Sequence, residues 1–217
     1  MGTDMSLRHE VEDELEWDPR LDSREIGVAV KDGVVTLTGQ VSSYAARCAA
    51  EQAAQSVVGV QGIANDIVVK LPLESTRTDA EIAAIAVMTL KHNVTVPSDD
   101  IKVIVRDGAI SLEGHVDHWF EKNAAQATLS TLRGIRGIAN NLAIRQQASQ
   151  PDVQAKIREA FRRRALADCG KVSVGCDGGV VTLEGQVHSA LDRQQVVSAA
   201  WQGPGVVQVV DNLKLVP

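Results

Sequence analysis

Residues 34–41, VVTLTGQV, decide the fold, because the chain repeats this stretch twice more. The second copy lies at 109–116 and the third at 180–187. Working outward from the stretch, residues 7–67 align without a gap with 82–142 and with 153–213. A period of this length is typical of a small folding unit used several times. The function must therefore be sought in the unit and in the positions where the three copies differ.

Repeated glycines mark the backbone of the unit. Three of the columns that are identical in all copies hold glycine, which tolerates backbone conformations that other residues avoid. These positions are expected to be structural. They are Gly33, Gly39 and Gly59, then Gly108, Gly114 and Gly134, and finally Gly179, Gly185 and Gly205.

Composition limits the classes of protein that the chain can represent. It has 217 residues and a net charge of −6, most of it in the first copy, which argues against a general nucleic-acid binder. Only 3% of the residues are aromatic, so the cores must be aliphatic. Three cysteines that match in no two copies do not form a disulfide framework. Copies this small bury little surface alone, so we expect them to pack on one another or on a partner.

The pattern of apolar residues predicts the elements of each unit. An i, i+4, i+8 stripe such as Ile82, Ala86 and Leu90 is typical of a helix, and alternating runs around Gly33 or Gly108 are typical of a β-hairpin. A second helix and a last strand follow. The fold class is therefore α+β, with three tandem αββαβ units, each a three-stranded sheet covered on one face by two helices. The predicted domains are unit 1 (1–72), unit 2 (76–146) and unit 3 (149–217).

Two predictions concern polar or small residues inside this pattern. Gly39 and its counterparts fall on the apolar face of their strand, where we expect a helix to cross too closely for a Cβ. Asn65, Asn140 and Asp211 lie in phase with apolar neighbours of the last strand. Such residues are expected to form hydrogen bonds, mainly with the backbone.

These motifs resemble the BON domain family. The resemblance rests on the VVTLTGQV stretch, on the second glycine twenty residues after the first, as in Gly59, and on the closing pattern at 63–67. It implies a non-enzymatic module of bacterial envelope or osmotic-stress proteins that binds phospholipid surfaces. A relative that binds potassium in the cytoplasm makes a potassium sensor the second interpretation. A protein-interaction scaffold is the third. The resemblance also implies a basic position early in the second helix: Arg47, Lys122 and Arg193.

The clearest departure from the repeat is Trp119-Phe120, where the other copies have Tyr44-Ala45 and Ala190-Leu191. Adjacent aromatics at a helix start cannot both enter the same core. One is expected either to insert into a lipid interface or to pack between copies. Both interpretations stay open.

A basic cluster in unit 3 is the other candidate site for lipid or a partner. It consists of Arg162, Arg163 and Arg164, on the predicted first helix of that unit. An anionic membrane would attract such residues, but a solvated helix face is the simpler explanation of them.

The sequence contains no motif typical of catalysis or of metal binding. There is no nucleophile–base pair and no phosphate loop, so no catalytic residue is predicted. His115, Asp117 and His118 lie close in sequence, but nothing completes a metal site, so none is predicted. The predicted partners are a phospholipid surface or another protein, with potassium the one cofactor under consideration. Without an apolar leader segment we expect a cytoplasmic location, or a periplasmic one if a signal sequence has been removed.

Overall fold

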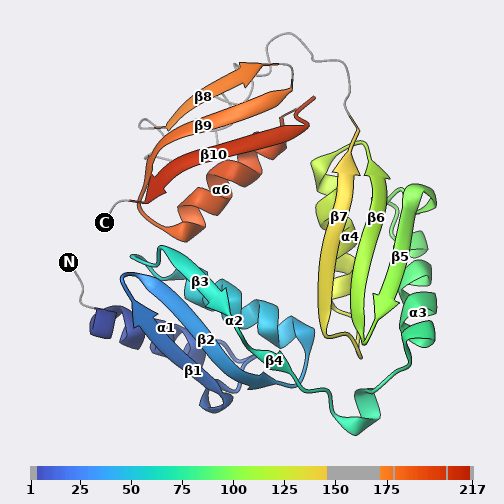
Figure 1. Cartoon of the computed structure of the whole chain (residues 1–217), viewed down its shortest axis with the longest axis horizontal. Coiled ribbons are helices and arrows are strands. Elements are labelled where there is room, and N and C mark those ends of the chain that lie inside the picture. The colour runs from blue at the N-terminus through green and yellow to red at the C-terminus, as the bar shows by residue number, and fades with distance from the viewer. Residues whose placement is uncertain (1–3, 146–171, 178, 204, 216–217) are drawn as a thin grey trace.

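The computed structural model describes residues 4–145, 172–177, 179–203 and 205–215, and each unit has its own sheet (Figure 1). Unit 1 contains α1 (Asp4–Trp17), η1 (Ser23–Glu25), β1 (Ile26–Lys31), β2 (Val34–Val41), α2 (Tyr44–Ser56), β3 (Gly62–Asn65) and β4 (Val68–Val69). After η2 (Leu73–Ser75), unit 2 contains α3 (Asp79–His92), η3 (Ser98–Asp100), β5 (Ile101–Arg106), β6 (Ala109–Val116), α4 (Trp119–Ser130) and β7 (Gly137–Ile144). Unit 3 contains β8 (Val172–Asp177), β9 (Val180–Val187), α6 (Ala190–Trp201) and β10 (Gln208–Leu215).

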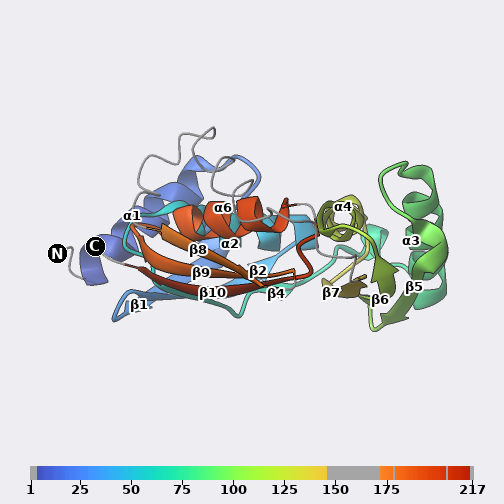
Figure 2. The same ribbon diagram turned by 90° about the horizontal axis from the view of Figure 1, so that it is seen from above.

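The predicted αββαβ order is confirmed in units 1 and 2. In each unit the central strand pairs antiparallel with the strand before it and parallel with the strand after the second helix. Unit 3 has the same sheet pairing, and its predicted first helix lies outside the described residues. In unit 1 the last strand is interrupted, so that β3 and β4 pair separately with β2. Figure 2 shows the helices of units 1 and 3 on the same side of their sheets.

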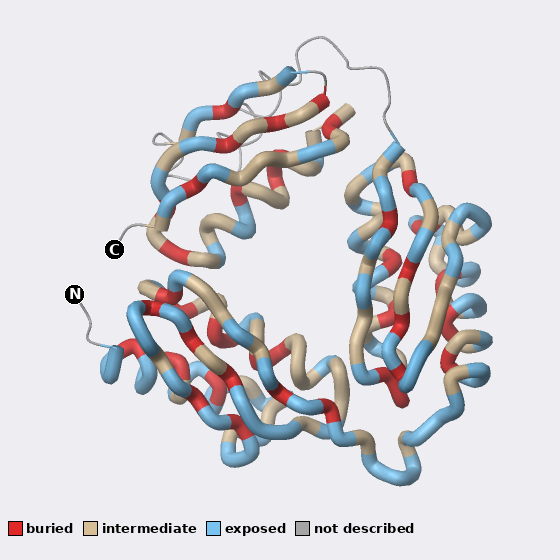
Figure 3. The backbone as a smooth tube through the Cα atoms, viewed as in Figure 1, coloured by how far each residue is buried: buried red, intermediate tan, exposed pale blue. Residues whose placement is uncertain are grey.

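The structure has three clusters of buried aliphatic residues, one in each unit, which lie between the sheet and the helices of units 1 and 2 and between the sheet and α6 of unit 3. In unit 2 the predicted helix stripe of Ile82, Ala86 and Leu90 is fully buried against Leu112 of the central strand. Buried residues alternate with exposed ones along the strands (Figure 3). Thr78 and Glu81 form the predicted capping box at the start of α3. The hydrophobic pattern therefore places the cores of units 1 and 2 correctly, and in unit 3 the part formed by the sheet and α6.

Hairpin turns are held by the first residue of the preceding helix. Both turn residues have positive φ in units 1 and 2, as the Asp-Gly pairs predict. In unit 2 the Asp79 carboxylate accepts hydrogen bonds of 2.9 Å from the N–H groups of Asp107 and Gly108. Asp4 accepts the corresponding bonds in unit 1. This anchor ties the first helix to the sheet, and the sequence patterns did not reveal it.

The strand glycines are required for a different reason from the one expected. At Gly39 and Gly114 φ is positive, and an added Cβ would overlap a backbone carbonyl oxygen of η1 or η3, at Glu25 or Asp100. The prediction that a crossing helix excludes the Cβ is therefore wrong. Gly59 and Gly134 also have positive φ, in the loops after the second helices.

Candidate functional site

The second helices connect the three units into a closed ring (Figure 1). Tyr44, the first residue of α2, packs against the core of unit 2. Trp119, the first residue of α4, stacks on Trp201 at the end of α6 in unit 3. The ring closes because α6 also contacts α2 of unit 1. The second helix of each unit, α2, α4 or α6, therefore takes part in the contacts between units.

The adjacent side chains of Trp119 and Phe120 have different ring partners. The rings of Trp119 and Trp201 are nearly parallel, with centroids 6.3 Å apart and an interplanar angle of 6°. Phe120 is 53% exposed and stacks on His118 rather than on a tryptophan, with centroids 5.4 Å apart. Trp119 thus packs between units, and Phe120 is the more accessible of the two.

A cavity of 420 Å³ opens where units 2 and 3 meet. Both tryptophans line it, as do His118, Phe120 and the loop after α6, with its glycines and valines. The described residues that line it are Asp117, His118, Trp119, Phe120, Arg145, Trp201, Gln202, Gly203, Gly205, Val206 and Val207. Volume, aromatic lining and a position between domains are common features of sites for small molecules.

The charged groups beside this cavity are partly paired with one another. Arg145 Nη2 donates to Asp100 at 2.8 Å and Nη1 donates to Asp117 at 3.3 Å. The bond to Asp100 is the main reason why the pKa of Arg145 is raised. At the start of α4 the N–H groups of Asp117 and His118 both donate to the Glu121 carboxylate, at 2.8 and 2.9 Å. This carboxylate satisfies the positive end of the helix.

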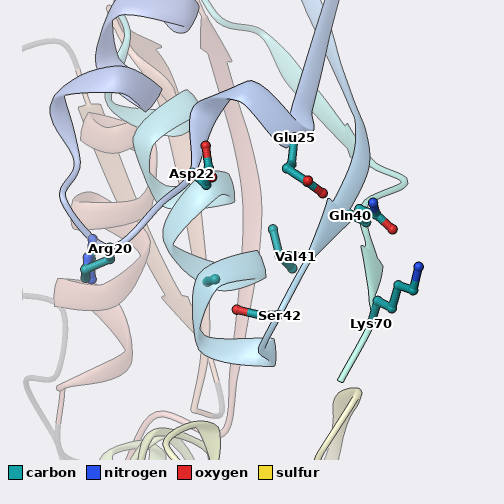
Figure 4. Close-up of a pocket in the computed structure, with 8 residues that line it drawn as sticks. Arg20, Asp22, Glu25, Gln40, Val41, Ser42 and Lys70 are labelled. Carbon is teal, nitrogen blue, oxygen red and sulfur yellow. The ribbon is translucent and has the colours of Figure 1, made fainter. Parts of the chain in front are cut away.

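Unit 1 has a polar pocket of 300 Å³ at the corresponding place (Figure 4). Glu25 and Lys70 line it, in the columns of Asp100 and Arg145. Asp22 lies beside them, and its hydrogen bond with Arg24 lowers its pKa. The sequence patterns did not reveal this pocket, because its residues come from four separate segments.

The in-phase polar residues of the last strand have the expected hydrogen bonds. Asn140 Oδ1 accepts from the N–H of Leu142, and its Nδ2 donates to the carbonyl of Lys122 at 2.8 Å. Asn65 makes the corresponding acceptor bond with Ile67. In unit 3 Asp211 accepts from the N–H of Leu213 and also from Arg193 Nε, at 2.7 Å. The change from Asn to Asp is thus matched by an ion pair with the basic position of α6.

This arrangement predicts different costs for two substitutions of Asp211. Asp211→Asn keeps the bond to the Leu213 N–H and loses the half-exposed ion pair, so we expect a loss of at most about 1 kcal/mol. Asp211→Ala loses both interactions and is expected to cost about 1–2 kcal/mol. Urea unfolding followed by circular dichroism measures both. Equal costs for the two variants would contradict the assigned role of the backbone bond.

Tyr44 provides a spectroscopic test of the junction between units 1 and 2. Burial there, together with a hydrogen bond to Cys48, raises its pKa from 10.0 to about 12. The folded state therefore retains the phenol proton longer than the unfolded state. This contribution to stability is complete below pH 10 and is lost as the pH rises to about 12.

Because Tyr44 is the single tyrosine of the chain, phenolate absorbance reports on it alone. We expect titration near pH 12 in the native protein and near 10 in urea. Circular dichroism at each pH controls for unfolding. A native protein that titrates near 10 would contradict the buried position of Tyr44.

The outer face of α3 is apolar, although its inner face already fills the core of unit 2. Met88 is 62% exposed beside Val87, and Val94 in the loop that follows is 99% exposed. Lys91 and His92 end the helix at the same place. The expected helix stripe covered only the inner face, so these residues were missed, although their spacing was available in the sequence.

The other sites considered from the sequence add no candidate binding site within the described residues. The cluster Arg162–Arg164 lies outside the described residues. Within the described ranges, no three His, Cys, Asp or Glu side chains converge as a metal site requires, and His115 is exposed. No helix in these ranges has the length and apolar character needed to span a bilayer.

Comparison with known proteins shows that the chain matches a protein family. The model of the BON domain matches three times, at residues 3–70, 78–146 and 149–217. The osmotically-inducible protein Y of Escherichia coli K12 is 30% identical over 128 residues, which cover 55% of this chain and 62% of that protein. The match thus spans less than two thirds of that relative.

Two solved structures show weak similarity. CdsD, a structural protein of the type III secretion system of Chlamydia trachomatis, is 14% identical with a TM-score of 0.28, over 96% of this chain and 91% of that one. The PrgH periplasmic domain is 13% identical with a TM-score of 0.22, over 89% and 96% of the two chains. Similarity at this level supports no conclusion about function.

Proposed function

Because the chain belongs to the BON domain family, we propose that it is a non-enzymatic stress protein that binds phospholipid surfaces through the outer face of α3. The relation to an osmotically inducible protein supports the stress-related part of this proposal. The observation that carries the membrane part is the exposure of Val87 and Met88 on α3 and of Val94 in the loop that follows. A helix that is apolar on both faces needs a second apolar environment besides its own core.

Comparison between units shows that the fold does not require this face. In the aligned columns of α1, unit 1 has Glu12, Asp13 and Glu16 where unit 2 has Val87, Met88 and Lys91. Both helices bury the same inner stripe and hold the same hairpin turn. The apolar residues of α3 therefore belong to unit 2 specifically, as a binding surface would.

The position of α3 leaves this face accessible. It lies at the outer edge of unit 2, away from units 1 and 3 in both views (Figures 1 and 2). Burial of a Val or Met side chain contributes about 1.5–3 kcal/mol, and a nearby Lys adds about 1 kcal/mol on an anionic surface. Together these contributions are sufficient for reversible membrane association.

Vesicle flotation tests the proposal directly. We expect the protein to float with phosphatidylglycerol-containing vesicles at low and at physiological salt. The double variant Val87→Glu with Met88→Asp places unit 1's residues on α3, so it is expected to fold and to lose at least about tenfold in binding. Leu73→Asp, at a residue 96% exposed in η2, adds a charge elsewhere and should leave binding unchanged.

Other outcomes assign the site differently. Loss of flotation in Phe120→Ala, with the α3 variant unaffected, would move the site to α4. Loss on neutralising Arg162–Arg164 would move it to unit 3. Failure of the wild-type protein to float with any vesicle would overturn the proposal. A thermal transition raised by potassium and not by sodium would then favour the ion sensor, and capture of a protein partner would favour the scaffold.

A further inference from the structure

We propose that the cavity between units 2 and 3 binds a small organic cation with a methylated ammonium head. This site is separate from the α3 face and does not depend on membrane binding. Its volume of 420 Å³ lies within the range of roughly 300–1,000 Å³ that is usual for small-molecule sites. The aromatic side chains and the distribution of charge around the cavity indicate the class of ligand.

Aromatic rings from two units are part of the cavity lining. Trp119 and Trp201 contribute nearly parallel rings from two different units, and Phe120 stacks on His118 at the same opening. The face of a tryptophan ring attracts a cation within about 6 Å of its centroid, and weakly hydrated alkylammonium groups benefit most. Two tryptophans beside one cavity therefore favour an organic cation over a neutral or anionic ligand.

Groups that would bind an anion are already occupied by the protein itself. Glu121 accepts from the N–H groups of Asp117 and His118 at the start of α4. The shortest contact of Arg145, 2.8 Å, is with Asp100, which lies outside the cavity lining. Among the described residues that line the cavity, Asp117 is the acidic one and Arg145 the basic one. The Asp117 carboxylate is about half exposed, and its bond with Arg145, 3.3 Å, is longer than the bond between Arg145 and Asp100.

The end of α6 adds to the negative potential. This helix ends at Trp201, so the carbonyl groups of its last turn carry partial negative charge beside the cavity. Its end thus complements a cation in the same place as the Asp117 carboxylate.

This combination occurs at one junction of the ring. Trp201 aligns with Gln55 and Ser130, and Trp119 aligns with Tyr44 and Ala190. The tryptophan pair is therefore not needed to form a junction as such, since the other junctions lack it. A specialised pair at one junction is expected for a ligand site.

Calorimetric titration of the full chain with choline and with tetramethylammonium tests the proposal. We expect both to bind, and the uncharged carbon analogue of choline, dimethylbutanol, to bind at least about tenfold more weakly. In a Trp17→Phe background the remaining tryptophans are Trp119 and Trp201, so fluorescence reports only on them. Trp17 is 84% exposed and lies outside the cavity, so its replacement leaves the site intact. Fluorescence change on adding choline would place the ligand at the pair.

Variants separate the contributions of charge and of the ring. Asp117→Asn keeps the shape of the cavity and is expected to weaken choline binding by roughly three- to tenfold. Trp201→Leu keeps apolar bulk without a ring and is expected to lose at least about tenfold, whereas Trp201→Phe should retain part of the binding. Circular dichroism verifies that each variant is folded, and Asp117→Asn, with no loss of packing, tests the site if the Trp201 variants unfold.

The methylated ammonium group can come from a free solute or from a lipid headgroup. Phosphatidylcholine vesicles that compete with choline would identify the headgroup as the source, and absence of competition would identify a soluble molecule. Either result supports the site. Equal affinity for choline and dimethylbutanol, no binding of either cation, or unchanged choline binding in both Asp117→Asn and Trp201→Leu would overturn it. None of these outcomes depends on whether α3 binds vesicles.

Discussion

Gly114→Ala is expected to destabilise unit 2 by about 3 kcal/mol or more, because two penalties act at one position. The residue has φ of +127°, a conformation that alanine rarely adopts. An added Cβ would also overlap the carbonyl oxygen of Asp100, which is backbone and cannot rotate away. The stability of a unit of this size is about 4–10 kcal/mol, so the loss is a large part of the total.

Gly137→Ala is the matched control in the same unit. Its added Cβ would meet no atom within 4 Å, and the change is expected to shift stability by less than about 0.5 kcal/mol. Urea denaturation followed by circular dichroism measures both variants. Similar stability for the two would show that the backbone at Gly114 can relax, and the assigned steric role would then be wrong.

Trp119→Ala is expected to open the ring between units 2 and 3, with a loss of about 2–3 kcal/mol in the stability of that junction. The substitution removes the partner of the Trp201 ring and enlarges the cavity beside it. Small-angle X-ray scattering should show a larger radius of gyration. Near-ultraviolet circular dichroism should lose the signal of the coupled indole rings.

Phe120→Ala is the control for this second prediction. It removes an aromatic ring from the adjacent position, but Phe120 stacks on His118 rather than on Trp201 and is more than half exposed. The scattering profile should therefore match that of the wild-type protein. Expansion in both variants would mean that the start of α4, rather than the indole contact, holds the two units together.

Inside a unit, the sequence predicted the helix stripes and the turns. Periodicity identified the buried stripe of α3, and the Asp-Gly pairs identified the turns, because both depend on neighbours along the chain. The reason for Gly39 was misjudged, since an in-phase glycine does not reveal whether a helix or a carbonyl approaches it.

Contacts between units could not be read in the same way. Trp119 and Trp201 occupy different columns of the repeat, so no alignment of the copies pairs them. The cavity between them depends on the rotation of one unit against the next, which periodicity does not encode. The apolar residues on the outer face of α3 could be read from the sequence. They were missed because the buried stripe on the inner face already explained why the helix is apolar.

Closure of the ring also limits how the protein can assemble with copies of itself. Each contact between units joins two different surfaces, and such heterologous contacts produce either a finite ring or an open filament. In the described part of this chain each unit contacts both of the others, so the surfaces at these junctions are used within one molecule. If one junction opened, the surfaces released would be complementary between molecules, and exchange of units would link chains together. Covalent connection of the units favours closure within one chain over exchange between chains, because the linked surfaces are always close to one another.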